Sequence, residues 1–270
     1  MKKILLLAAI FSGAVFLSGC AKKEPAETLP GQTAPTSIPT KPVEETIKER
    51  PYVSLNVSSD NHWLTIDIKN IRKEMTALEY ELTYFADFEG NRIERGISSG
   101  GKPVELSNQT EFSKKLLLGS ASCTTGACKY KYDENVNEGM LILTLIGSGG
   151  KEKYESAFRI QKGKEAKEGL SAGDGVFSLI STALPQNSLY LTISSVGIPV
   201  QLPEGVTAKS IPYGVFPNLA GKGTVSFKTS LIQASIYALS GKSWQKLETT
   251  FEPGKAAAGF SNTSLFILGE

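Results

Sequence analysis

From residue 52 onward, the chain alternates apolar and polar residues with a period of two. Val53, Leu55 and Val57 alternate with Ser and Asn, and the runs at residues 64–68 and 78–84 repeat the pattern. Successive side chains of a β-strand point to opposite faces, so each run predicts a strand with one buried face. No convincing amphipathic helix interrupts these runs.

Similar runs fall at residues 111–118, 127–132, 140–146 and 154–160, and Gly-rich turns separate them. Six or seven short strands in about 110 residues predict an antiparallel β-sandwich at residues 51–162. The strand rhythm resembles that of immunoglobulin-like and fibronectin type III-like modules. The Cys-Trp-Cys spacing of immunoglobulin domains is absent.

A polar stretch at residues 163–173 breaks the pattern and predicts a linker. Beyond it, a second β-sandwich domain is predicted at residues 174–270. Residues 236–268 resemble the closing strands of β-sandwich modules from bacterial surface proteins. The expected strands of this domain lie at residues 176–181, 188–194, 200–202, 224–229, 234–239 and 244–250, with a possible edge strand at 206–211.

The amino-terminal residues read as an export signal. Lys2 and Lys3 precede an apolar run at residues 4–17, which is shorter than the ~20 residues that span a bilayer. Leu17-Ser18-Gly19-Cys20 follows, and the whole stretch resembles the signal peptide and lipobox of a bacterial lipoprotein. The resemblance implies cleavage after residues 1–19 and acylation of Cys20, with palmitate among the expected acyl groups.

Lipidation at Cys20 would anchor the exported chain to a membrane of the cell envelope, since two or more acyl chains anchor stably. Ala21 stands where an Asp would resemble an inner-membrane retention signal, which favours the outer membrane or the cell surface in bacteria with two membranes. Residues 20–50 are rich in Pro, Thr and Glu and contain no aromatic residue, which predicts a disordered, flexible linker.

Removal of the signal peptide changes the charge balance. Lys2 and Lys3 are two of the 29 basic residues, so 27 remain against 27 acidic residues and the formal net charge is zero. A neutral chain gives no reason to expect nucleic acid as a partner.

The cysteine count also fits export. Of three cysteines, Cys20 is assigned to lipidation, which leaves Cys123 and Cys128 as a pair. In an oxidising compartment, this spacing predicts a small disulfide loop. A zinc site is the alternative, but zinc requires four ligands and His62 is the only histidine, so no metal and no cofactor are expected.

Catalytic signatures are scarce. His62 lies behind a polar turn and reads as a turn or strand-end residue, and no Gly-x-Ser-x-Gly motif occurs. Residues 133–139 approach the composition of a calcium loop without matching the EF-hand pattern, so solvated turn residues are expected there. No catalytic residue is assigned. The alternative is an envelope hydrolase that uses a pair of carboxylates.

Tyr130 and Tyr132 alternate with Lys129 and Lys131 directly after the predicted disulfide. Base rates for alternating strands favour tyrosines that face the core. If they are exposed instead, the four residues form an aromatic and lysine ribbon suited to an envelope protein or a glycan. The sequence thus predicts a non-catalytic, lipid-anchored envelope protein with binding or structural β-sandwich modules.

Overall fold

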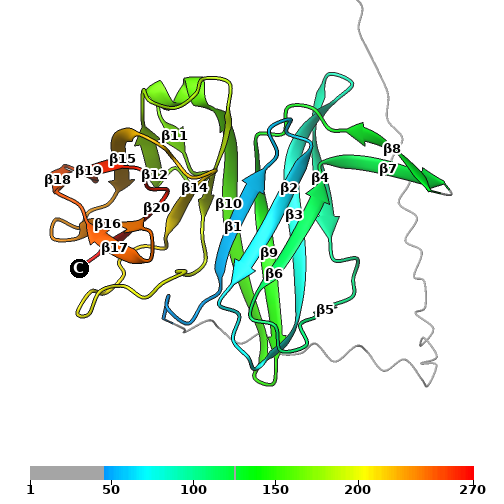
Figure 1. Cartoon of the computed structure of the whole chain (residues 1–270), viewed down its shortest axis with the longest axis horizontal. Helices are drawn as coiled ribbons and strands as arrows, with labels where there is room; N and C mark the ends of the chain where they lie inside the picture. Colours follow the sequence, from blue (N-terminus) through cyan, green and yellow to red (C-terminus); the bar gives the residue numbers. More distant parts are fainter. Residues whose placement is uncertain (1–45, 125) are drawn as a thin grey trace, which may run out of the picture. The chain divides into compact units, whose positions relative to one another are not determined.

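Strands occupy most of the described chain, which comprises residues 46–124 and 126–270 of a computed structural model (Figure 1). The predicted signal peptide, Cys20 and most of the predicted linker at residues 20–50 lie outside the described residues. All strand pairs are antiparallel within the described part, which confirms the predicted all-β fold class. Among these residues, no helix has the length and apolar character needed to cross a membrane.

The elements follow in chain order as β1 (Tyr52–Val57), β2 (Trp63–Lys69), β3 (Met75–Phe88), β4 (Asn91–Ser98), β5 (Val104–Glu105), β6 (Phe112–Leu117), β7 (Gly119–Thr124), β8 (Ala127–Tyr132), β9 (Glu138–Gly147), β10 (Gly150–Lys162), the 3-10 helix η1 (Gly163–Lys167), β11 (Leu170–Ser171), β12 (Phe177–Ile180), β13 (Leu189–Ser194), β14 (Tyr213–Phe216), β15 (Lys222–Lys228), β16 (Ser235–Ser240), β17 (Ser243–Lys246), β18 (Thr249–Glu252), β19 (Lys255–Ser261) and β20 (Leu265–Gly269).

A long sheet with strand order β17-β16-β20-β14-β13-β10-β9-β3-β4 runs through both predicted sandwiches. The three-stranded sheet β1-β2-β6 packs on one face of this long sheet at its β3 and β9 end (Figure 1). In β3, Leu78, Tyr80 and Leu82 are buried in the first core, while Glu79 and Glu81 alternate with them on the opposite face. The period of two in the sequence therefore sets which face is buried.

The five-stranded sheet β11-β12-β15-β19-β18 covers the other end of the long sheet. Strand β13 shows that it covers the opposite face. Leu191 and Ile193 belong to the first core, whereas Tyr190, which directly precedes Leu191, belongs to the second. Because neighbouring side chains of a strand point to opposite faces, the two cores lie on opposite faces of one sheet.

The boundary between the predicted domains is bridged by hydrogen bonds, because β10 pairs with β13 over residues 158–162 and 189–193. The stretch predicted as a linker, residues 163–173, holds η1 and β11, and its Ala166 and Leu170 are fully buried in the second core. All described residues belong to one compact unit. The division into domains at 51–162 and 174–270 stays a prediction.

Two expected strands of the second half are wrong. Residues 200–202 are irregular, and residues 206–211 contain only a single bridge between Ala208 and Gly269. Their apolar residues instead lie on the face of the long sheet that is opposite the second core. There, Leu202 and Val206 pack on a third apolar cluster. Its buried members are Tyr52, Ile198, Tyr237, Trp244, Leu265 and Ile267.

Ser195 joins the turn after β13 to β1. Its hydroxyl donates to the carbonyl oxygen of Val53 at 2.7 Å and accepts from the Val53 N–H at 3.2 Å, and both residues are buried. The single hydroxyl therefore satisfies two main-chain groups on the edge of β1 that faces away from β2.

We expect Ser195→Ala to lower the free energy of unfolding by about 1–3 kcal/mol, because it leaves buried main-chain groups of Val53 without a partner. Urea unfolding followed by circular dichroism measures the change. Ser122→Ala, which changes an exposed serine of β7, serves as the control and should leave stability within about 0.5 kcal/mol of the unchanged chain. Equal stability of the two variants would contradict the assigned role of Ser195.

Candidate partner-binding surface

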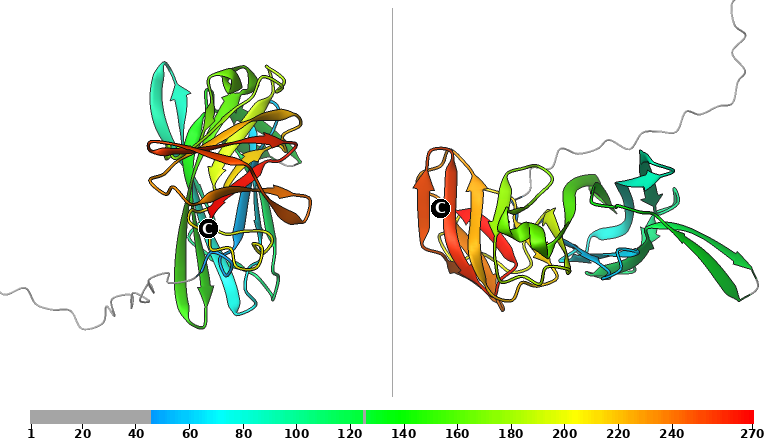
Figure 2. Two further views of the ribbon diagram at one scale, coloured as in Figure 1. Left: turned by 90° about the vertical axis from the view of Figure 1, so that its left-hand side faces the viewer. Right: turned by 90° about the horizontal axis from the view of Figure 1, so that it is seen from above.

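The hairpin β7–β8 extends beyond the paired sheets of the first sandwich (Figure 1 and Figure 2). It forms a two-stranded sheet of its own, in which Cys123 lies directly opposite Cys128. The two sulfur atoms are 2.10 Å apart, so the predicted disulfide is present. At the base of the hairpin, Gly119 has a φ of +145°, and a Cβ there would lie 2.2 Å from the carbonyl oxygen of Lys131. Only glycine allows this close approach.

The side chains of β8 are all exposed, including Tyr130 at 46% and Tyr132 at 36%. The expectation favoured by base rates, in which both tyrosines face the core, is therefore wrong, because the hairpin lies outside both sandwiches. Alternation places Tyr130 and Tyr132 on one face of the strand and Lys129 and Lys131 on the other. The four residues are thus brought together on one strand but separated into an aromatic and a basic side.

Two further rings from the start of β2 join the tyrosines. His62 stacks on Tyr132 with 3.6 Å between ring centroids and 3° between ring planes. Trp63 meets Tyr130 edge to face at 5.7 Å, and the tyrosine rings are 6.1 Å apart and nearly parallel. We call these four residues, His62, Trp63, Tyr130 and Tyr132, the aromatic face.

Charged groups hold and flank the aromatic face. His62 Nδ1 lies 3.0 Å from Asp60 Oδ2, which fixes one side of the imidazole. The hydroxyl of Ser58 and then the main-chain N–H of His62 bind the Asp60 carboxylate and lower its pKa, so the anion is favoured beside the ring. Lys115 Nζ lies 4.7 Å from the ring centroid of Trp63. A cation over an indole face is a favourable contact that also orients the ring.

On the basic side of the hairpin, Lys131 contacts an aromatic ring of the first sandwich. Lys131 Nζ lies 4.8 Å from the ring of Phe88, which Arg95 also approaches at 5.7 Å. These cation–π contacts tie β8 to the end of β3. Lys131 therefore helps to hold the hairpin in place, while Tyr130 and Tyr132 on the other side remain open to solvent.

The carboxylates considered for calcium lie at the hairpin base and contact arginines. Asp133 accepts hydrogen bonds from the Tyr84 hydroxyl at 2.8 Å and from Arg95 Nη2 at 3.3 Å. Glu138 pairs with Arg92 at 3.2 Å. Within residues 46–124 and 126–270, no group of three His, Cys, Asp or Glu side chains is placed to hold a metal ion.

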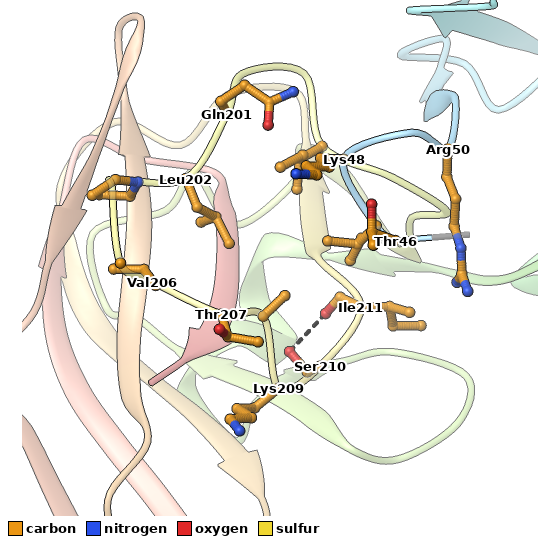
Figure 3. A pocket seen from close by; sticks show the side chains of 15 residues that line it. Thr46, Lys48, Arg50, Gln201, Leu202, Val206, Thr207, Lys209, Ser210 and Ile211 are labelled. Atoms are coloured by element: carbon orange, nitrogen blue, oxygen red, sulfur yellow. Dashed lines mark hydrogen bonds between the residues drawn. The ribbon is translucent and has the colours of Figure 1, made fainter. Parts of the chain in front are cut away.

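A separate groove of about 830 Å³ lies between residues 46–50 and 198–211 (Figure 3). Apolar side chains such as Leu202 and Val206 form part of its wall, and Lys48 also lines it (Figure 3). None of the described residues that line this groove is an Asp or a Glu. The groove therefore supplies no carboxylate pair for the alternative of a hydrolase.

The chain matches no model of a known protein family, and no curated protein is significantly similar to it in sequence. The sequence indicated Tyr130 and Tyr132 but missed His62 and Trp63, because the contact between β2 and β8 is tertiary and leaves no local signal.

Tyr84 is expected to make the free energy of unfolding depend on pH in the alkaline range. Burial, and next the hydrogen bond to Asp133, raise the pKa of Tyr84 well above its ordinary value of 10.0. The unfolded chain loses this proton near pH 10 while the folded chain keeps it, so the stabilising contribution is present below pH 10 and is lost as the pH rises further.

We expect Tyr84→Phe to weaken the decline in stability above pH 10, although the variant is about 1–3 kcal/mol less stable at pH 7 because Asp133 loses a partner. Denaturant unfolding at pH values from 7 to 11 measures both effects. Burial also raises the pKa of Tyr52 and Tyr213, so part of the decline should remain. A variant with an unchanged alkaline slope would show that Tyr84 does not contribute.

Proposed function

We propose that this chain is a lipid-anchored, non-catalytic binding protein of the cell envelope, and that its aromatic face contacts a protein or polysaccharide partner. The observation that carries the proposal is the gathering of four rings outside both cores, from His62 and Trp63 at the turn into β2 and from the two tyrosines of the disulfide-closed hairpin. Such rings contribute nothing to the main cores, yet their faces and edges are held by specific contacts.

The chemistry of these side chains supports binding. Tyrosine and tryptophan offer large apolar faces with a polar atom at the edge, and they dominate the energy of many interfaces. Aromatic rings also stack on the apolar faces of sugar rings. The disulfide and the His62 and Trp63 contacts order the hairpin before binding, which reduces the entropy lost when a partner docks.

The proposed location rests on the sequence. The resemblance of residues 1–20 to a lipoprotein signal and lipobox supports acylation of Cys20, and the disulfide is consistent with an oxidising, extracytoplasmic compartment. A neutral mature chain supports anchoring by acyl groups rather than by attraction to anionic lipid.

For the anchor, we expect Cys20→Ala to abolish labelling by radioactive palmitate in a bacterial host and to move the protein from the detergent phase to the aqueous phase of Triton X-114. The reason is that the variant has no thiol to acylate. Cys123→Ala is the matched control and should still be labelled. Labelling of the Cys20→Ala variant at the normal level would contradict the anchor.

For the binding surface, we expect Tyr130→Ala combined with Tyr132→Ala to weaken binding to envelope material at least tenfold, since truncation of central aromatic contacts commonly has effects of this size. Two fractions serve as probes: detergent-solubilised envelope protein, and protease-treated envelope polysaccharide. The fraction that loses binding identifies the class of partner.

Phe251→Ala is the control for that experiment, because Phe251 is an exposed aromatic residue on β18, in a different sheet. Lys129→Ala tests the opposite side of the hairpin and should have less effect. Unchanged binding in the double tyrosine variant, with the fold intact by circular dichroism, would rule out the aromatic face while leaving the anchor proposal standing.

A further inference from the structure

The outer face of the three-stranded sheet β1-β2-β6 continues from the aromatic face. On β2, every second residue from Trp63 to Lys69 points outward, whereas the residues between them, such as Ile66, are buried in the first core. The outward side chains of β2 and β6 are exposed or half-buried. At about 3.3 Å per residue, the row from Trp63 to Lys69 is roughly 20 Å long, which suits an extended ligand.

Hydrogen-bonding side chains occupy the middle of this outer face. The strand registers place Asn56, Thr65 and Lys115 in one row across the three strands, and Asp67 and Ser113 in the next row. Asp67 accepts hydrogen bonds from the Ser113 hydroxyl at 2.7 Å and from the Asn56 amide at 3.3 Å. A carboxylate can accept about four hydrogen bonds, so Asp67 is held in place and still has acceptor capacity for a ligand.

A groove of about 510 Å³ lies at the far end of this row, between the last residues of β2 and the loop before β6. We call it the polar groove, because all the side chains that line it except those of Ile68 and Phe112 can donate or accept hydrogen bonds. The polar lining residues are Asp67, Lys69, Asn108, Gln109, Thr110, Glu111 and Ser113. The loop is attached to the end of β2 by a hydrogen bond of 2.9 Å from the Ile71 N–H to the Thr110 carbonyl oxygen.

The charges along this surface balance. Lys69 and Lys115 are matched by Asp67 and Glu111, and Lys115 is already engaged over the ring of Trp63. A surplus of one sign would attract ligands of the opposite charge. The balance therefore favours a neutral ligand.

The open edge of β6 is unsuited to an added peptide strand. Within the described residues, β6 is an edge strand of its sheet. Lys114 has the same parity as Phe112 and Leu116, which pack on the first core, and its side chain is exposed. An inward-pointing charge on an edge strand disfavours pairing with another strand. A ligand that does not bind by main-chain pairing is therefore favoured.

We propose that this surface binds a neutral polysaccharide, whose sugar rings stack on the aromatic face and whose next units form hydrogen bonds with Asp67 and the polar groove. The inference rests on the proposed function and narrows its partner to a polysaccharide. A sugar ring carries CH groups on its faces, which pack on aromatic rings, and hydroxyls at its rim, which both donate and accept. Rings at one end of the row and carboxylate, amide and hydroxyl groups along the rest match a chain of such units.

Size-sorted oligosaccharides, released by partial acid hydrolysis of protease-treated envelope polysaccharide, serve as probes. Titration calorimetry with the mature chain carrying Cys20→Ala measures their affinity. We expect affinity to rise with fragment length up to roughly 20 Å, because longer fragments reach the polar groove as well as the aromatic face. Raising the salt concentration from about 50 mM to 1 M should change affinity less than about twofold, since the ligand is neutral.

Gln109→Ala combined with Thr110→Ala removes two exposed side chains of the polar groove. We expect about fivefold or greater loss of affinity for long fragments, and a change below about twofold for the shortest fragments that bind, because those occupy only the aromatic face. Gln245→Ala combined with Thr250→Ala is the matched control, since it removes the same side chains from exposed positions of the second half. Circular dichroism verifies the fold of each variant.

The tyrosine variants separate this inference from the proposed function. Tyr130→Ala combined with Tyr132→Ala should weaken short and long fragments alike. If it does so while the groove variant binds long fragments as tightly as its control, the polar groove is overturned and the proposed function stands. Unchanged binding in the tyrosine variant would instead overturn the aromatic face itself.

Two further outcomes would overturn the class of ligand. Binding to solubilised envelope protein alone would exclude a polysaccharide while leaving the aromatic face as a binding surface. A loss of about tenfold or more in affinity over the same salt range would show that the ligand is charged.

Discussion

The main-chain pairing between β10 and β13 is the constraint on which the rest of the structure depends. It joins the sheets of the two sandwiches into one, and so the middle of that sheet must be buried on both faces. Strand β13 meets this demand with five buried residues after Leu189. The polar ones are hydrogen-bonded: Thr192 donates to the carbonyl of Ser171 at 2.6 Å, and Ser194 contacts the main chain of Ala157 at 3.0 Å. Buried hydroxyls without such partners would be destabilising.

Because each core lies on a different face of this sheet, each sandwich leaves one face of the sheet without a second sheet over it. In the second half, residues 198–211 and the chain before β1 cover that face with the third apolar cluster. In the first half, none of the sheets formed by residues 46–124 and 126–270 covers the corresponding face. The hairpin β7–β8 belongs to neither core, so Tyr130 and Tyr132 stay partly exposed. A disulfide closes the hairpin in place of buried apolar area.

Alternation in the sequence predicted most of the fold, since the runs around Leu55, Leu82 and Leu143 all became strands with the expected buried face. Strand β4 was not predicted because its outward residues are charged and Gly96 interrupts it, and β14 was missed because Pro212 and Pro217 flank a run of four residues. The sequence could not show that β10 pairs with β13, because strand partners far apart in the chain share no local pattern.

For the candidate surface, the sequence located the disulfide and the tyrosine pair, but not the direction in which Tyr130 and Tyr132 point. Direction depends on whether a second sheet covers the strand, and that is decided by tertiary packing. The same limit applies to His62, whose polar surroundings suggest only a turn, although the fold stacks it against Tyr132. The sequence therefore predicted the disulfide between Cys123 and Cys128, but it did not predict the contacts among the aromatic rings.

The strand order of the smallest sheet has a mechanical consequence. A pull between the amino-terminal end of β1 and the hairpin passes through β1, β2 and β6, because the hairpin follows β6 directly. Both pairings are antiparallel, so β1 and β6 run in the same direction and are loaded at opposite ends. Tension then shears the ladders, with the hydrogen bonds along each strand sharing the force at once, rather than opening them one after another like a zip. The route from the amino-terminal end of β1 to the hairpin thus follows the direction in which a β-sheet resists extension best.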